Sequence, residues 1–137
     1  MPSRVFVDTS AYVALARSND EHHQDALAIA QKLRRQRASL YMTNFVVAET
    51  HALLLRYLGA SAARSFLREV DKGTVAIVVR ADPTDEELAK TLIYHHTDKE
   101  YSLVDAISFV VMERLRLKQA FAFDKHFAQY GWQVPTA

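Results

Sequence analysis

VFVDTS, at residues 5–10, is the stretch that decides the fold of this chain. Three consecutive apolar residues, two of them β-branched, predict a short strand that is buried on both faces, as in a parallel sheet. The polar residues at 8–10 end that strand, and the helix-prone segment 11–17 follows directly. A strand that runs into a helix predicts an α/β architecture, in which residues at the carboxyl ends of strands face one crevice.

Short apolar runs predict further strands, the last of them at the sheet edge: residues 40–42, 75–79, 120–123 and 131–134. Helical spacing of apolar residues predicts helices between them: 21–36, 44–57, 60–72, 84–96 and 102–117. Thr43 or Asn44 can cap the second of these, Thr84 and Glu87 can form a capping box, and Ser102 can begin the last. We therefore expect an α/β fold, a three-layer α/β/α sandwich around a mainly parallel five-stranded sheet, formed by residues 1–137 as one domain.

The composition excludes several classes of protein. The 137 residues are 50% hydrophobic and 24% charged, which is typical of a globular chain and not of a disordered one. Without cysteine, the chain can form no disulfide, no cysteine-ligated metal site and no thiol nucleophile. No apolar stretch is long enough to span a membrane, and nothing near the N-terminus resembles a targeting segment. We expect a cytoplasmic protein that has no membrane partner.

Three aspartates stand where predicted strands end or helices begin. Asp8 follows the first strand and Asp124 follows the fourth, so in a parallel sheet both carboxylates face the same crevice. Asp105 lies in the first turn of its predicted helix. Taken singly, each has an ordinary alternative role as a turn residue, a helix cap or a partner of the helix dipole.

Glu49 is harder to explain as a structural residue. Phe45 and Leu53 stand four residues before and after it, which places its carboxylate on the apolar stripe of a predicted helix. A buried carboxylate requires a cation, a proton or a hydrogen-bonded partner. The alternative is that Glu49 lies at the edge of the stripe and reaches water or an arginine.

Four carboxylates that meet in one crevice repel one another and need cations between them. Oxygen ligands, without cysteine or a matching pair of histidines, favour Mg²⁺ or Mn²⁺ over zinc. Two such ions about 4 Å apart can clamp the attacking and leaving oxygens of a phosphodiester. The 17 basic and 16 acidic residues nearly balance, so with these acids set aside the rest of the chain is mildly basic and can attract a polyanion.

Four motifs, in this order, resemble those of the PIN domain, and most closely those of the small PIN ribonucleases that are VapC-type toxins. The motifs are VFVDTS with Asp8, VAET with Glu49, SLVDA with Asp105 and FDKHF with Asp124. The resemblance implies a Mg²⁺- or Mn²⁺-dependent endoribonuclease whose catalytic residues and metal ligands are these four acids. It also implies a homodimer, and an antitoxin, often itself DNA-binding, that covers the active site.

The same resemblance gives supporting roles to three hydroxyl side chains. Thr9 and Ser10 match polar positions at which a side chain orients a carboxylate or a water, and Ser102 is a further candidate. Many relatives carry threonine or serine two residues before the last aspartate, where this chain has Ala122. We expect that hydroxyl contact to be missing or to come from another group, such as Ser10 or Ser102.

Three other side chains are candidates for contact with the substrate. Lys125 and His126 directly follow the last aspartate, and Tyr12 stands close after the first. The lysine and histidine can approach a phosphate, and the tyrosine can stack on a base. For His126 and Tyr12 local packing is the alternative.

The remaining clusters of charged and histidine residues have ordinary interpretations. The basic residues within 32–37 suit the end of a helix, and contact with RNA is their alternative role. His22 and His23, like the pair at 95–96, lack the spacing of a zinc site and are expected at the surface.

The leading hypothesis is thus a metal-dependent endoribonuclease that acts as the toxin of a toxin–antitoxin pair. A housekeeping RNA-processing nuclease and a catalytically silent binding module of the same fold are the alternatives. A phosphoacceptor signalling domain would need paired acids after the first strand, where only Asp8 stands.

Overall fold

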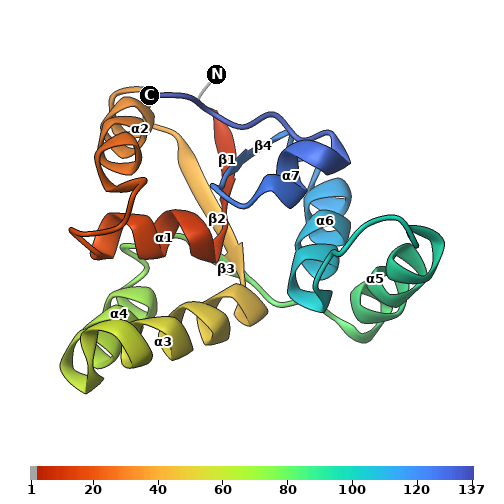
Figure 1. Ribbon diagram of the computed structural model, residues 1–137, viewed down its shortest axis with the longest axis horizontal. Helices are drawn as coiled ribbons and strands as arrows, with labels where there is room; N and C mark the ends of the chain where they lie inside the picture. The colour runs from red at the N-terminus through yellow and green to blue at the C-terminus, as the bar shows by residue number, and fades with distance from the viewer. Residues whose placement is uncertain (1–2) are drawn as a thin grey trace.

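The computed structural model describes residues 3–137, so the first two residues of the expected domain lie outside the described residues. The elements of the described chain alternate between short strands and helices (Figure 1). In chain order they are β1 (Arg4–Val7), α1 (Thr9–Ala16), α2 (His23–Arg35), β2 (Ser39–Thr43), α3 (Asn44–Leu58), α4 (Ala60–Lys72), β3 (Ile77–Val79), α5 (Pro83–His95), α6 (Leu103–Leu115), β4 (Gln119–Phe121) and α7 (Lys125–Tyr130).

The strands form one parallel sheet in the order β3-β2-β1-β4. The chain adds β2 and β3 on one side of β1 and then crosses to add β4 on the other side. The strand order therefore reverses at β1, and its carboxyl end, where Asp8 stands, is the topological switch point at which such sheets bind ligands. The predicted α/β fold with a parallel sheet is confirmed.

The prediction of a fifth strand at 131–134 is wrong for the described chain. Only an isolated parallel bridge joins Gln133 to Gln119, with the Ala120 amide donating to the Gln133 carbonyl at 2.8 Å. Gly131 has a φ of 111°, which ends α7 in a left-handed turn, and Pro135 has no amide hydrogen to extend a ladder. Little chain is left between them for a strand.

Two predicted strands are also shorter than expected. β3 covers only Ile77–Val79 and lies at the edge of the sheet. β4 ends at Phe121, because the amides of Phe123 and Asp124 donate to the side-chain oxygen of Ser10. The last aspartate is thereby attached to the turn that follows β1.

Helices cover both faces of the sheet (Figure 1). Val5 and Val7 point toward α1 and α2, whereas Phe6 packs with residues of α6 and α7. Residues 105–112 of α6 are buried without interruption, because α5 covers the side of this helix that faces away from the sheet. None of the helices of residues 3–137 is long and apolar enough to cross a membrane.

Capping residues fix the helix starts that position the site. Asp8 caps α1, and Thr43 caps α3 by accepting a hydrogen bond from the Val46 amide. The predicted capping box of Thr84 and Glu87 is wrong. Asp82 and Asp85 form it instead, with a proline at the first helical position.

Candidate active site

Asp8 is the most deeply buried carboxylate of the four predicted ligands. It is 3% exposed, and it accepts hydrogen bonds from the Ser10 amide at 3.1 Å and the Ser10 hydroxyl at 2.7 Å. Burial raises the pKa of Asp8 to about 7, although the bonds from Ser10 oppose the rise. The carboxylates of Asp105 and Glu49 raise this pKa further, so both lie close enough to repel it.

Ser10 connects Asp8 to the backbone of the segment that carries Asp124, and we call these hydrogen-bonded residues the frame of the site. Its hydroxyl donates to Asp8 and accepts the backbone amides of Phe123 at 2.9 Å and Asp124 at 3.3 Å. From the sequence, the hydroxyl contact that Ala122 cannot make is expected to be missing or to come from another group, such as Ser10 or Ser102. The Ser10 hydroxyl contacts the turn that follows Ala122, which is compatible with the second alternative.

Asp105 is positioned by the start of its own helix. Ser102 accepts a hydrogen bond from the Asp105 amide, and the Asp105 carboxylate accepts one from the Ser102 amide, at 3.0 and 3.1 Å. The same carboxylate oxygen, Oδ2, that accepts the Ser102 amide also lies 2.8 Å from His126 Nδ1. Ser102 thus orients Asp105, as the sequence suggested.

Asp124 caps α7 and faces the same histidine. Its Oδ1 accepts the His126 amide at 2.9 Å and lies 3.1 Å from His126 Nδ1. The His126 side chain is only 16% exposed, and its Nδ1 contacts carboxylate oxygens of both Asp105 and Asp124. The sequence indicated this histidine as a substrate contact and gave no sign that it would join the acids.

Glu49 reaches the cluster from α3 and is half-buried. Burial raises its pKa, hydrogen bonding with Thr9 opposes the rise, and the charges of Asp105 and Asp124 add to it. Thr9 is itself held by the Thr50 hydroxyl, which donates to it at 3.2 Å, and it donates weakly to the Val46 carbonyl at 3.5 Å. Thr9 therefore links the start of α1 to the helix that carries Glu49.

The four predicted acids thus act on one another electrostatically. Burial is the main cause that raises the pKa of Asp105, and the charge of Asp124 is the next. Each carboxylate pKa that moves in this cluster moves upward, because burial and mutual repulsion outweigh the local hydrogen bonds. Such a cluster of acids is a candidate for binding a positive charge.

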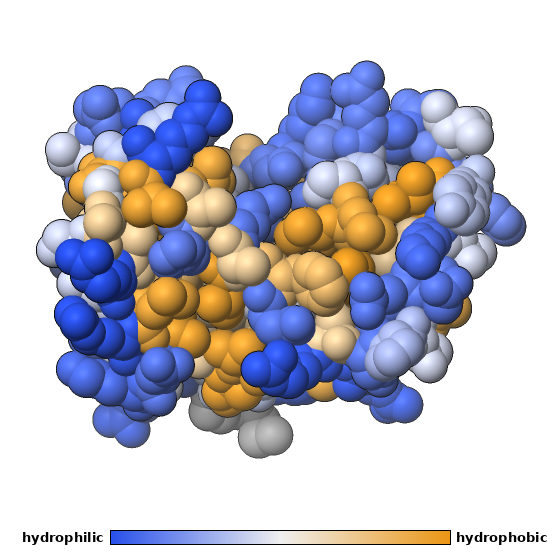
Figure 2. All heavy atoms as spheres, turned by 90° about the horizontal axis from the view of Figure 1, so that it is seen from below, coloured by the Kyte–Doolittle hydropathy of each residue, from blue (hydrophilic) through white to orange (hydrophobic). Residues whose placement is uncertain are grey.

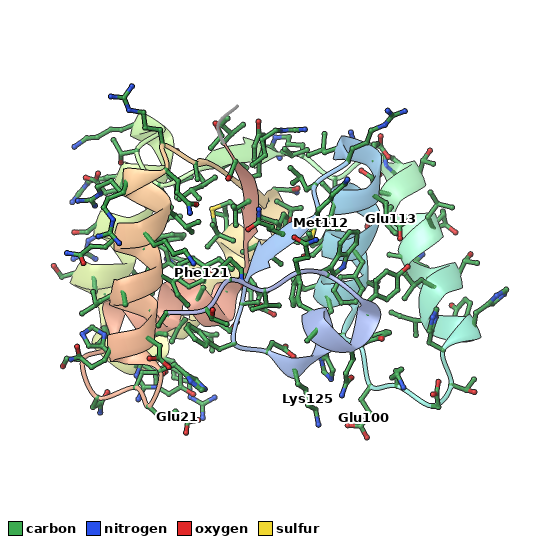
Figure 3. The ribbon with its side chains drawn as sticks, turned by 90° about the horizontal axis from the view of Figure 1, so that it is seen from above. Glu21, Glu100, Met112, Glu113, Phe121 and Lys125 are labelled. Carbon is green, nitrogen blue, oxygen red and sulfur yellow. The ribbon has the colours of Figure 1, made fainter. Side chains whose placement is uncertain are left out.

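The molecule has a hollow between its two helical sides. Figure 2 shows a hollow at its upper edge, between the side with α1 and α2 and the side with α5, α6 and α7. Glu21 and Lys125 are on opposite sides of it (Figure 3). Lys125 and His126 also line a polar pocket of about 300 Å³ together with residues 98–100 and Gln129. Lys125 is exposed there.

Tyr12 does not join the site. Its ring packs against Phe66 with the centroids 4.7 Å apart, and it lines a separate, largely apolar cavity of about 480 Å³ between α1, α2 and α4. The structure therefore favours the alternative of local packing for this tyrosine. The structure brings together most of the other residues that the sequence indicated: the four acids, Ser10, Ser102 and Thr9. His126 also contacts two of these acids.

The donor atoms of the cluster fit a hard divalent cation. Carboxylate oxygens of Asp105 and Asp124 and a ring nitrogen of His126 all lie within 4.8 Å of one another. Mg²⁺ and Mn²⁺ prefer oxygen ligands, and a single imidazole is compatible with Mn²⁺. Asp8 and Glu49 add negative charge close by, as the raised carboxylate pKa values indicate.

Replacing Ser10 by alanine tests how the frame is held. We expect Ser10→Ala to lower the free energy of unfolding by about 1–2 kcal/mol, because two backbone amides and the Asp8 carboxylate lose a partner. It also raises the pKa of Asp8 further, since the bonds from Ser10 lower it, so the pH–rate profile of cleavage moves to higher pH.

Urea unfolding and the pH dependence of the rate measure these two effects. The exposed Ser65 of α4 provides the matched control, Ser65→Ala, which changes neither. An unchanged pH profile in Ser10→Ala would contradict the role of this hydroxyl in tuning Asp8.

The chain is similar to several known proteins. The family model described as PIN domain matches residues 5–133. The 23S rRNA-specific endonuclease VapC20 of Mycobacterium tuberculosis is 36% identical over 129 residues, which cover 93% of this chain and 95% of that protein. The VapC ribonuclease of Archaeoglobus fulgidus is 28% identical over 123 residues, which cover 89% and 78%.

Solved structures show the same similarity. The crystal structure of Mycobacterium tuberculosis VapC20, described as a Sarcin-Ricin loop cleaving toxin, matches with a TM-score of 0.86 and 33% identity, covering 97% of this chain and 99% of that one. The structure of FitAcB from Neisseria gonorrhoeae matches with a TM-score of 0.66 at 14% identity, covering 95% of each chain, and supports the fold alone.

Proposed function

This chain belongs to the PIN domain family, and we propose that it is a divalent-metal-dependent endoribonuclease that acts as the toxin of a toxin–antitoxin pair. The observation that carries the proposal is the convergence of Asp8, Glu49, Asp105 and Asp124 at the switch point of the sheet. Four clustered carboxylates repel one another and lower the stability of the folded state unless a cation binds them. A catalytically silent binding module does not account for this cost.

The four acids are the proposed metal ligands and catalytic residues, and the hydroxyl groups around them are the positioning residues. A divalent ion held there would activate a water and offset charge on the phosphodiester. Ser10 fixes Asp8 against the segment that carries Asp124, and Ser102 fixes the rotamer of Asp105. Mg²⁺ and Mn²⁺ are the proposed ions, because the donor set is dominated by carboxylate oxygen.

His126 and Lys125 have separate proposed roles. The partly buried ring of His126 lies against Asp105 and Asp124, where it can hold both carboxylates in place or add a nitrogen ligand. Lys125 is exposed and carries the only formal positive charge among the side chains proposed for the site, which suits a phosphate of the substrate.

The proposed substrate is RNA, and ribosomal RNA is the first class to test. VapC20, which shares 36% of its residues with this chain, carries a name that specifies 23S rRNA. A substrate of this kind implies action in the cytoplasm. A housekeeping RNA-processing nuclease with the same site is the second candidate, and the cleavage pattern distinguishes it.

We also propose a homodimer and a cognate antitoxin, often a DNA-binding protein in such pairs. Hydrophobic side chains gather on the face seen in Figure 2. The described chain also has large hydrophobic side chains that are 43–52% exposed on α3 and α5: Leu55, Tyr57, Leu58 and Leu88. Exposed apolar area of this kind favours association with a protein partner, which light scattering of the purified chain can detect.

The decisive experiment is to incubate the purified protein with intact ribosomes and with total RNA, and to sequence the new RNA ends. We expect cuts at one or a few positions in the presence of Mn²⁺ or Mg²⁺, and none after addition of EDTA. Many cuts that trim precursor ends would favour the housekeeping nuclease instead. Unaltered RNA with both metals would contradict the proposed activity.

A further inference from the structure

The imidazole ring of His22 lies flat on the phenyl ring of Phe123, with centroids 4.5 Å apart and planes inclined by 6°. Phe123 directly precedes Asp124, and its amide donates to the hydroxyl of Ser10 beside Asp8. The sequence suggested that His22 is an ordinary surface residue. The structure instead stacks it on a residue that is part of the frame of the active site.

The side chain of His22 is only partly covered. It is 41% exposed, although Phe123 covers one face completely enough to stack in parallel. Glu21 approaches His22 Nε2 at 3.5 Å, and a ring nitrogen lies at the edge of the imidazole and not on its face. The stack with Phe123 uses one face of the ring, and the 41% exposure of the side chain leaves room for a further contact.

The loop that carries His22 is held in place before any ligand binds. The His22 amide donates to the Asp20 carboxylate at 2.8 Å, and the Asp20 amide donates to the Arg17 carbonyl at 3.0 Å. The next residue, His23, is anchored with its Nδ1 2.7 Å from the Ala14 carbonyl oxygen. A platform that is already ordered loses little conformational entropy when something stacks on it.

The position of this loop relative to the hollow decides what can reach the ring of His22. Glu21, next to His22, is on one side of the hollow, and Lys125, next to Asp124, is on the other (Figure 3). A chain of nucleotides whose phosphate lies at the carboxylates would pass between these two sides. On one side of the hollow, Lys125 can contact a phosphate of this chain of nucleotides. On the other side, His22 offers a flat aromatic ring.

We propose that the ring of His22, backed by Phe123, is a stacking platform for one unpaired nucleobase of the RNA, next to the phosphodiester that is cut. This inference rests on the proposed function, because it requires RNA in the hollow. Unstacked bases of single-stranded RNA are recognised in this way by aromatic side chains, with little dependence on base edges. Purines present a larger face than pyrimidines, so the platform favours a purine at this position.

The test measures binding of labelled hexaadenylate and hexauridylate by fluorescence anisotropy with Mn²⁺ present. All variants carry Asp8→Asn so that the RNA is not cut. We expect the parent to bind hexaadenylate more tightly than hexauridylate. Adding His22→Ala weakens hexaadenylate binding about 10-fold and removes the preference, whereas His22→Phe, which keeps a flat ring, retains both. His95→Ala, at an exposed histidine in the last turn of α5, is the matched control and changes neither.

The outcomes separate this inference from the function on which it rests. A parent that binds neither RNA would overturn the proposed function, and with it the platform. A parent that binds both RNAs, but whose affinities are unchanged by His22→Ala, would overturn the platform alone. An equal loss for both RNAs that His22→Phe does not restore would assign His22 a structural role in the loop and would also overturn it. The salt dependence of binding stays the same in His22→Ala, because no phosphate contact is removed.

Discussion

Asp8→Asn is expected to reduce the rate of RNA cleavage by more than about 100-fold. The same substitution is expected to raise the free energy of unfolding of the metal-free protein. Loss of a residue that only supports a metal ligand typically costs about 10- to 100-fold, and loss of a proposed ligand costs more. The stability gain has a separate origin. Asp8 is 3% exposed with a pKa raised to about 7, so its charge is unfavourable in the folded state near neutral pH. Asparagine keeps an oxygen that can accept the bonds from Ser10 and carries no charge.

The size of the gain follows from the pKa. The rise from 3.8 to about 7 corresponds to at most about 4 kcal/mol in the free energy of unfolding at neutral pH and above. Urea unfolding in EDTA measures it, and an initial-rate assay with Mn²⁺ measures cleavage. Asp71→Asn, at an exposed aspartate of α4, is the matched control and changes neither. If Asp8→Asn cuts RNA at the rate of the unaltered protein, the assignment of the active site is wrong.

Mn²⁺ is expected to raise the melting temperature by about 10 °C at about 100 times its dissociation constant. Binding to the folded state alone adds about 2.7 kcal/mol at that excess, and each kcal/mol corresponds to a few degrees in a chain of this size. The shift has to disappear in the double variant Asp105→Asn with Asp124→Asn, since both proposed ligands are then lost. Calorimetry or a dye-based melt gives the measurement. An unaltered protein that shows no shift would favour the catalytically silent binding module.

The pH dependence of stability without metal has a definite sign. Asp8 is protonated up to about pH 7 when folded but only up to about pH 4 when unfolded, so the folded state binds more protons in this range. The contribution of Asp8 to the free energy of unfolding therefore falls as the pH rises from about 4 to about 7, and the raised pKa values of Glu49 and Asp105 act in the same direction. Bound Mn²⁺ reverses the trend, because it binds the deprotonated carboxylates. A slope of the same sign with and without Mn²⁺ would show that these acids are not the binding site.

The details of the structure that the sequence did not predict share a physical cause. The strand predicted at 120–123 ended early because a serine more than a hundred residues away took over the amides of Phe123 and Asp124. Tyr12 packs against Phe66 of α4, which is the alternative of local packing that the sequence left open, and no local pattern indicates this partner. Hydrogen-bond and packing partners that are distant along the chain decide such details, and local propensity does not contain them.

His126 and His22 show the same limit for function. The spacing of the histidines excluded a zinc site but could not show that one ring would contact two carboxylates and another would stack on Phe123. The positions of α7 and of the loop between α1 and α2 in the folded chain decide which groups these rings contact.

The sequence by itself determined the parallel α/β architecture and the four acids at its crevice, because both follow from short-range patterns. A buried apolar run, its terminating polar residues and the helix caps are all local, and Asp8, Asp105 and Asp124 each stand at such a boundary. The tertiary structure alone decided how these acids are tuned. The pKa of Asp8 near 7, the bridge through Ser10 and the aromatic pair of His22 and Phe123 depend on burial and on contacts between segments that are far apart in the chain. Burial and Coulomb repulsion act through space, so they exist only once the strands have brought these segments together.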